Sequence, residues 1–286
     1  MNPLAHEHGL GALVGPGSQP EDFDGGRLEY MVMPDEMRVF SMAAIPEAEV
    51  AADHAAGLAA AAEVLGALDA VAAGAPGRSV DVSGLDPADL RFLDQLLGEG
   101  EVSVVLGGDT QAQESVLAGV WRVRVSGADG RRVSDRVDVG AFPLGLVDRA
   151  FAGASATVQL PEAAFEGVFN APALLAEINA HAGEARADGD PHVINLSLLP
   201  HTEGDLALLE AALGQGELII LSRGYGNCRI RSTQTRDCWR VRYFNSQDTL
   251  ILDAIEISPL PAVCQAARED IADSADRLRE ILAIYR

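Results

Sequence analysis

The chain has 286 residues, 48% of them apolar, and a formal charge of −22. That length and apolar content suffice for two packed cores without disulfide or metal support. The charge excludes general binding to a nucleic-acid backbone, because neutralising phosphates requires clustered cations. Nucleic acid is therefore not an expected partner.

The first 45 residues are rich in glycine, proline and acidic residues and are predicted to be irregular. This segment has no apolar stretch after a basic N-terminal region, as a secretory signal would have. The longest apolar stretch, residues 58–73, is interrupted by Glu63 and Asp69 and is not expected to span a bilayer. Three cysteines, an odd number, fit a reduced compartment. A cytoplasmic protein without membrane association is predicted.

After residue 45 the predicted helices and strands occur in the same order twice. A helix from Pro46 to about residue 73 precedes a strand at 79–83 and a second helix that Asp86 caps and Gly98 ends. Strands at 101–106, 121–125 and 132–139 follow, with a loop between the first two. The second copy has strands at 193–198, 217–221, 239–243 and 249–257, and a helix that Thr202 caps and Gly214 ends.

The two copies also share residues. Residues 89–101 align without a gap onto 205–217, with seven of thirteen positions identical, and Trp-Arg-Val-Arg recurs at 121–124 and 239–242. The two tryptophans of these segments are the only ones in the chain. A period of about 116 residues is too long for a solenoid repeat and indicates a duplicated domain.

The predicted fold class is therefore α+β, with two tandem duplicated two-layer α/β sandwich domains, each with an antiparallel or mixed sheet packed by helices. The expected division is an irregular acidic segment at 1–45, a first repeat at 46–151, a linker at 152–171 and a second repeat at 172–286.

A final helix, at residues 269–285, extends beyond the repeat. Its apolar stripe runs through Ile271, Ala275, Leu278, Leu282 and Tyr285. Such a stripe either packs on the helix's own domain, which we expect, or forms the seam of a homodimer or another partner.

All 21 basic residues are arginine, and eleven of them fall in two matching segments. Residues 121–136 hold five arginines against two aspartates, and residues 223–242 hold six against one. The molecule should therefore be electrically two-sided. Arginine's planar fork suits interfaces and carboxylates, although a solvated strand face explains the clusters equally well.

Partner-binding candidates lie in the second copy, where it differs from the first. One is the loop of Arg223, Gly224, Tyr225, Gly226 and Asn227, whose counterpart retains only the first glycine. Two glycines allow a tight turn or a close approach to a partner, and a plain structural turn is the alternative. The other candidates are three residues of the last-but-one strand, Arg240, Arg242 and Tyr243, and Asn245 in the loop that follows it.

Catalytic and metal signals are weak. Cys228 and Cys238 could meet across a hairpin, but two thiols without a third ligand nearby are poor evidence for a metal site. The histidines form no helical pair, and no nucleophile elbow accompanies the serines. We therefore expect no enzyme activity and no cofactor.

Several segments carry a family resemblance. GPGSQP, LLGEGEVSV with LGQGEL, RGYGN, WRVRYFNSQDTLILDAIEISPLP and EDIADSADRLREIL resemble the HupH/HyaF hydrogenase expression proteins over nearly the whole chain. The resemblance implies an accessory factor in [NiFe]-hydrogenase maturation. It further implies a chaperone for the iron-sulfur small subunit precursor before assembly and twin-arginine export, acting with a thioredoxin-like companion. A metal or iron-sulfur handling protein that uses Cys228 and Cys238 is the alternative.

Overall fold

A computed structural model describes residues 46–47, 51–182, 189–224 and 226–285. The predicted irregular segment and the candidate Tyr225 lie outside the described residues.

Ten strands form one sheet in the order β1-β5-β4-β3-β2-β7-β8-β9-β10-β6, and every neighbouring pair is antiparallel. The strands are β1 (Arg78–Asp81), β2 (Val102–Leu106), β3 (Thr110–Glu114), β4 (Val120–Ser126), β5 (Arg132–Val139), β6 (His192–Asn195), β7 (Leu218–Ser222), β8 (Asn227–Ser232), β9 (Cys238–Phe244) and β10 (Leu250–Ile257).

The helices are α2 (Ala55–Ala72), α3 (Pro87–Leu97), α4 (Leu146–Ala150), α5 (Ala171–Ala182), α6 (Glu203–Leu213) and α7 (Arg268–Ile284), with short 3-10 turns η1 (Leu196–Leu198) and η2 (Ala262–Cys264). The predicted ends of α3 and α6 are confirmed, whereas the first helix, predicted from Pro46, begins at Ala55 after a turn. The Asp86 side chain accepts from two backbone N–H groups of α3, and Thr202 forms a capping box with Asp205 on α6. Gly98 and Gly214 follow the helices with the same positive φ of 61°.

The strands of both copies belong to one sheet and not to two separate sheets. Each half has the same order, because β1, β5, β4, β3 and β2 correspond to β6, β10, β9, β8 and β7. The halves join where β2 pairs with β7, from Val102 opposite Ser222 to Leu106 opposite Leu218. Both strands are largely apolar, and pairing them removes two edges that would otherwise invite aggregation. The α+β class is confirmed, and the domain limits stay a prediction.

One face of the sheet centres on the two tryptophans. Trp121 and Trp239 are fully buried, and their indole N–H groups donate to the carbonyls of Gly140 and Ser258, at 3.0 and 2.9 Å. α4 and η2 contribute buried side chains to this core, and Phe151 packs edge-to-face on Trp239. The first copy's trailing segment thus contacts the second copy's tryptophan.

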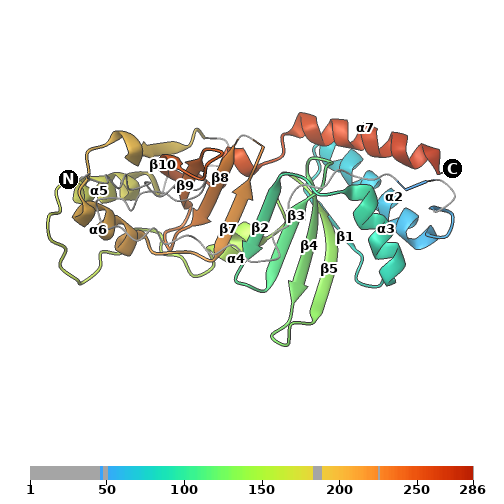
Figure 1. Ribbon diagram of the computed structural model, residues 1–286, viewed down its shortest axis with the longest axis horizontal. Coiled ribbons are helices and arrows are strands. Elements are labelled where there is room, and N and C mark those ends of the chain that lie inside the picture. Colours follow the sequence, from blue (N-terminus) through green and yellow to red (C-terminus); the bar gives the residue numbers. More distant parts are fainter. Residues whose placement is uncertain (1–45, 48–50, 183–188, 225, 286) are drawn as a thin grey trace, which may run out of the picture. The chain divides into compact units, whose positions relative to one another are not determined.

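Helices cover the other face at its two ends (Figure 1). α2, α3 and α7 form a core with β1 and β5, while α5 and α6 form another with β6 and β10. The central strands β2, β3, β7 and β8 contribute no residue to either of these cores. The middle of this face therefore lies between two helix layers.

The final helix does not pack on its own copy, so that prediction was wrong. α7 lies beside α2 of the first copy (Figure 1), and Tyr285 donates to the carbonyl of Pro46 at 2.7 Å. Arg279 pairs with Asp69 across the same contact, at 2.5 Å. The apolar stripe of α7 is buried in the core of α2 and α3, because those two helices alone leave that core open on one side.

By length and composition, α2 could cross a membrane, with a mean hydropathy of 1.6. Six of its residues, among them Val64 and Leu68, are buried, in a core that α2 shares with α3 and α7. Core helices of globular proteins have the same composition.

Candidate partner-binding surface

The two candidate loops of the second copy lie at the same end of the sheet. Residues 223–226 connect β7 to β8, residues 245–249 connect β9 to β10, and Asn227 lies opposite Phe244. A Cβ at Gly224 would meet the carboxylate of Glu101, which is the end of an exposed, flexible side chain and can move aside. The Asn245 side chain accepts from two backbone N–H groups of its own loop, at 2.9 and 3.0 Å, and so shapes the turn.

The predicted strand candidates divide between the two faces. Arg240 and Arg242 lie on the face with the helix layers, whereas Tyr243 lies on the tryptophan face. Burial, followed by the interaction with Cys228, raises the pKa of Tyr243 to about 12. The alternation of a strand explains the division. Tyr243 is thus part of the tryptophan core and is separated from the two arginines.

Four arginines instead gather on one face of β8 and β9. Arg229 lies directly opposite Arg242, and Arg231 lies directly opposite Arg240. We call Arg229, Arg231, Arg240 and Arg242 the arginine strip. Like charges directly opposite each other destabilise a strand pair, so this arrangement requires compensation.

Two carboxylates compensate part of that charge. Asp253 on β10 accepts two hydrogen bonds from Arg240, at 2.6 and 2.5 Å, and one from Arg242 at 3.4 Å. Asp248 pairs with Arg229 at 2.8 Å, and the Phe244 ring lies 4.2 Å from the same guanidinium.

Arg231 donates to the Gly216 carbonyl and the Gln215 amide, and among the described residues it has no ion-pair partner. Burial, and next the charge of Arg242, lower its pKa. Among the described residues the strip thus has four arginines and two carboxylates at ion-pair distance, and the charge of Glu210 acts on Arg231 from farther away.

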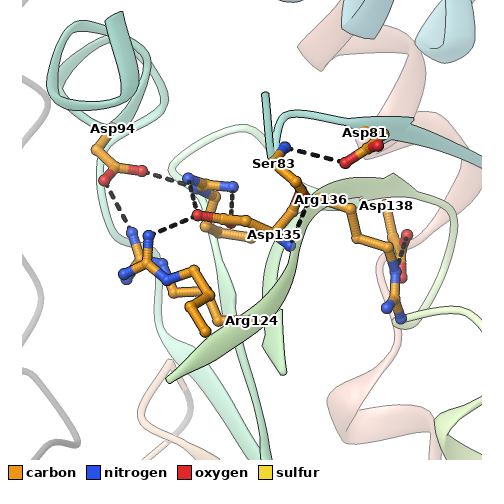
Figure 2. A network of polar contacts seen from close by, with 9 residues as sticks. Asp81, Ser83, Asp94, Arg124, Asp135, Arg136 and Asp138 are labelled. Carbon is orange, nitrogen blue, oxygen red and sulfur yellow. Dashed lines mark hydrogen bonds and ion pairs between the residues drawn. The ribbon is translucent and has the colours of Figure 1, made fainter. Parts of the chain in front are cut away.

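In the first copy the charge of the corresponding strand arginines is compensated in a different way. Gln111 and Gln113 on β3 stand where Arg229 and Arg231 stand on β8, opposite Arg124 and Arg122. Figure 2 shows Asp94 of α3 directed toward Arg124. Asp94 bonds both Arg122 and Arg124, at 2.9 and 2.8 Å, and Asp135 bonds Arg122 and Arg132. The first copy thus has three strand arginines, Arg122, Arg124 and Arg132, for two carboxylates, and Arg122 is only 8% exposed.

The helix residue that corresponds to Asp94 is Glu210 on α6, by the 116-residue offset. Its carboxylate accepts a hydrogen bond from Gln215 at 3.2 Å. The described residues show no ion pair between Glu210 and the strip. Arg242 remains 42% exposed, against 36% for Arg124.

The two cysteines of the alternative metal site, Cys228 and Cys238, do not meet. Cys228 lies opposite Tyr243 in the tryptophan core, whereas Cys238 begins β9, five positions away, in the core of α5 and α6. Burial raises their pKa values to about 11 and about 12. No group of three or more potential ligands occurs in the part of the chain that the structure describes. Buried thiols of this kind are structural.

Sequence reasoning missed Arg229 and Arg231. It treated residues 222–238 as a loop, although Asn-Cys-Arg-Ile-Arg-Ser alternates between apolar and basic side chains. Cys228 and Ile230 do lie in the core, and the arginines between them face the other way. That alternation was the available signal.

Comparisons with known proteins identify relatives. The sequence model of the HupH hydrogenase expression protein C-terminal conserved region matches residues 55–151 and 168–285. The hydrogenase expression/formation protein HupH of Rhodobacter capsulatus is 44% identical over 95% of this chain and 96% of its own length. HoxQ of Cupriavidus necator is 43% identical over 94% of this chain and 95% of its own.

A more distant relative is the hydrogenase-1 operon protein HyaF of Escherichia coli, 35% identical over 71% of this chain and 72% of its own. Among solved structures, the hydrogenase expression protein HupH from Thiobacillus denitrificans is 32% identical. It covers 42% of this chain and 98% of its own, with a TM-score of 0.38. The chain belongs to the HupH/HyaF family of hydrogenase expression/formation proteins.

Proposed function

We propose that this protein is a cytoplasmic accessory factor of [NiFe]-hydrogenase formation that binds the iron-sulfur small subunit precursor before assembly and export. The names of its relatives support a role in making hydrogenase. The role is binding and not catalysis, and a thioredoxin-like maturation protein is a further partner. A homodimer through the α7 stripe is not part of the proposal, since α2 buries that stripe.

The observation that carries the binding role is the arginine strip next to two loops. Guanidinium groups in excess of their carboxylates are suited to contacts with another protein. Exposed apolar side chains lie beside them, since Leu250 is opposite Phe244 and Ile251, its neighbour, is 60% exposed. An arginine and apolar mixture of this kind is typical of protein interfaces.

Co-purification tests the proposal. The affinity-tagged chain, produced in a strain that makes the hydrogenase and lysed mildly, should recover the small subunit with its export signal still attached, as identified by mass spectrometry. A strain without the small subunit gene provides the background. Failure to recover the precursor above that background would overturn the proposal.

A pair of variants tests the location. Arg242→Ala removes an exposed guanidinium of the strip and should reduce recovery about tenfold, the loss typical of one interfacial arginine. Arg131→Ala, in the loop between β4 and β5, removes a side chain that is 88% exposed and should leave recovery unchanged. Equal recovery with the two variants would place the binding surface elsewhere.

A further inference from the structure

The arginine strip has a geometry that selects for one kind of ligand. Arg229 and Arg231 are two residues apart on β8, as Arg240 and Arg242 are on β9. Residues two apart along a strand lie on the same face, about 6.6 Å from each other. The backbone positions that carry these arginines therefore repeat along each strand with the period of an extended peptide.

The strip also has a charge that an acidic ligand would complement. Among the described residues its four arginines form ion pairs with two carboxylates, in a chain whose formal charge is −22. Arg231 is the position with the most to gain, because its present acceptors are an amide and a carbonyl. Arginine binds a carboxylate through two parallel N–H···O bonds, which an amide cannot match.

The first copy serves as an internal comparison. The same strands, in the same register, carry Gln111 and Gln113 in place of Arg229 and Arg231. Asp94 of α3 also bonds both strand arginines there. The fold therefore does not require four arginines at this place, and glutamines at the same positions form the same kind of strand pair.

We propose that the arginine strip is a docking site for an extended, acidic segment of a partner protein, with carboxylates at alternate residues. This inference rests on the proposed role as a partner-binding accessory protein and adds the chemistry of the segment recognised. The segment lies along β8 and β9, between the two helix layers, and its carboxylates take up the guanidinium groups that Asp248 and Asp253 leave in excess.

Fluorescence anisotropy with a defined probe tests the site. The probe is a fluorescein-labelled peptide, Glu-Thr-Glu-Thr-Glu-Thr, added to the full-length protein at low salt. A rearranged peptide, Glu-Glu-Glu-Thr-Thr-Thr, has the same charge without the alternate spacing. We expect saturable binding of the first peptide that weakens as salt is added, and weaker binding of the second. No binding of the first, or equal binding of both, would overturn the proposal.

The decisive variant copies the first half of the molecule. Arg229→Gln with Arg231→Gln should weaken probe binding at least tenfold, and the melting temperature should stay the same or rise because two like-charge pairs are lost. Arg78→Gln with Arg131→Gln removes the same charge outside the strip and should change affinity less than twofold. Equal weakening in both would show general electrostatics and overturn the site. If the first pair fails to fold, Arg242→Gln, at a more exposed position, replaces it.

Two further comparisons separate the outcomes. A single-stranded DNA 12-mer that binds more tightly than the peptide, and is lost with the same arginines, would overturn the proposal in favour of nucleic acid. Recovery of the small subunit precursor together with no probe binding would overturn the docking site and leave the chaperone role standing. Probe binding without recovery of the precursor would overturn the chaperone role and support the docking site.

Discussion

Asp205 determines how two helices of the second half begin. It is completely buried, and its carboxylate accepts four backbone N–H hydrogen bonds of 2.8–3.0 Å, from Phe169, Asn170, Ala171 and Thr202. Three of these donors stand at the start of α5, and the fourth is the cap of α6. Burial opposes ionisation, yet the four N–H groups together keep the pKa of Asp205 below its ordinary value.

Asp205→Asn should lower the free energy of unfolding at pH 7 by about 2–3 kcal/mol, because an amide nitrogen cannot accept the N–H groups that one carboxylate oxygen now accepts. Since the folded pKa lies below the unfolded value of about 3.9, this stability is present above pH 4 and is lost as the pH falls further. Urea denaturation at pH 7 and pH 3 measures both effects.

Asp89 is the matched control, at the corresponding position of α3. Within the described part of the chain its side chain has one hydrogen bond, to His54 at 3.3 Å, and Asp86 caps the helix instead. Asp89→Asn should therefore cost less than about 1 kcal/mol. Equal losses at the two positions would contradict the role given to Asp205.

Glu114, at the end of β3, behaves in the opposite way. Burial first, and also the charges of Glu101 and Asp270, raise its pKa to about 7, although the Gly119 N–H donates to it at 3.4 Å. The folded pKa lies above the unfolded value of about 4.3, so stability decreases between these two values and stays low at higher pH.

Glu114→Gln keeps the acceptor for Gly119 and removes the charge. At pH 8 this variant should be more stable than the parent by about 1–3 kcal/mol, and near pH 4 the difference should vanish. Thermal unfolding at the two pH values measures the change. A variant that is destabilised equally at both would contradict a buried, ionisable Glu114.

At the scale of elements, the packing of α7 has a measurable energetic consequence. Leu278 is completely buried in the core that α7 shares with α2 and α3. Leu278→Ala should therefore lower the free energy of unfolding by about 2–5 kcal/mol, the range for a core leucine. Ile284→Ala, on the same helix but 59% exposed, should change it by less than about 0.5 kcal/mol. Comparable losses in chemical denaturation would contradict the packing of α7 on α2.

The elements show what the sequence could reveal. Local chemistry identified the helix ends at Gly98 and Gly214, and alternation placed Trp121 in the core with Arg122 on the opposite face. β3 escaped prediction because Thr-Gln-Ala-Gln-Glu has a single apolar residue, and its strand conformation comes from pairing with β2 and β4. Where α7 packs depends on a contact between residues about 200 positions apart, which no local pattern contains.

Only part of the candidate site could be predicted from the sequence. Arg240 and Arg242 were found because they stand in the repeated Trp-Arg-Val-Arg segment. Their opposition to Arg231 and Arg229 follows from the register of β8, which the sequence does not state. Cys228 and Cys238 do not meet, since face and register decide which side chains meet.

At the scale of the whole molecule, the repeat does not predict independent halves. β2 and β7 join them into one sheet, and α7 and Phe151 each reach from one copy to the other. We therefore expect the described part of the chain to unfold in a single cooperative transition.

The two tryptophans allow a direct test, because each copy contains one. Trp121→Phe leaves Trp239 as the fluorescent reporter of the second half, and Trp239→Phe leaves Trp121 for the first. In each variant the midpoint of fluorescence should coincide with the midpoint of far-ultraviolet circular dichroism. Fluorescence and dichroism midpoints that separate in either variant would show that the halves unfold independently.

The position of α7 also has a consequence for the order in which the protein is made. The ribosome completes β1 to β5 more than one hundred residues before it reaches Arg268, yet the core of α2 and α3 needs that last helix. During synthesis an apolar face of α2 therefore stays uncovered until α7 is made, which takes about 10 s at ordinary elongation rates. A nascent chain that stops before α7 displays this face, so unfinished molecules present the hydrophobic surface that chaperones and proteases recognise.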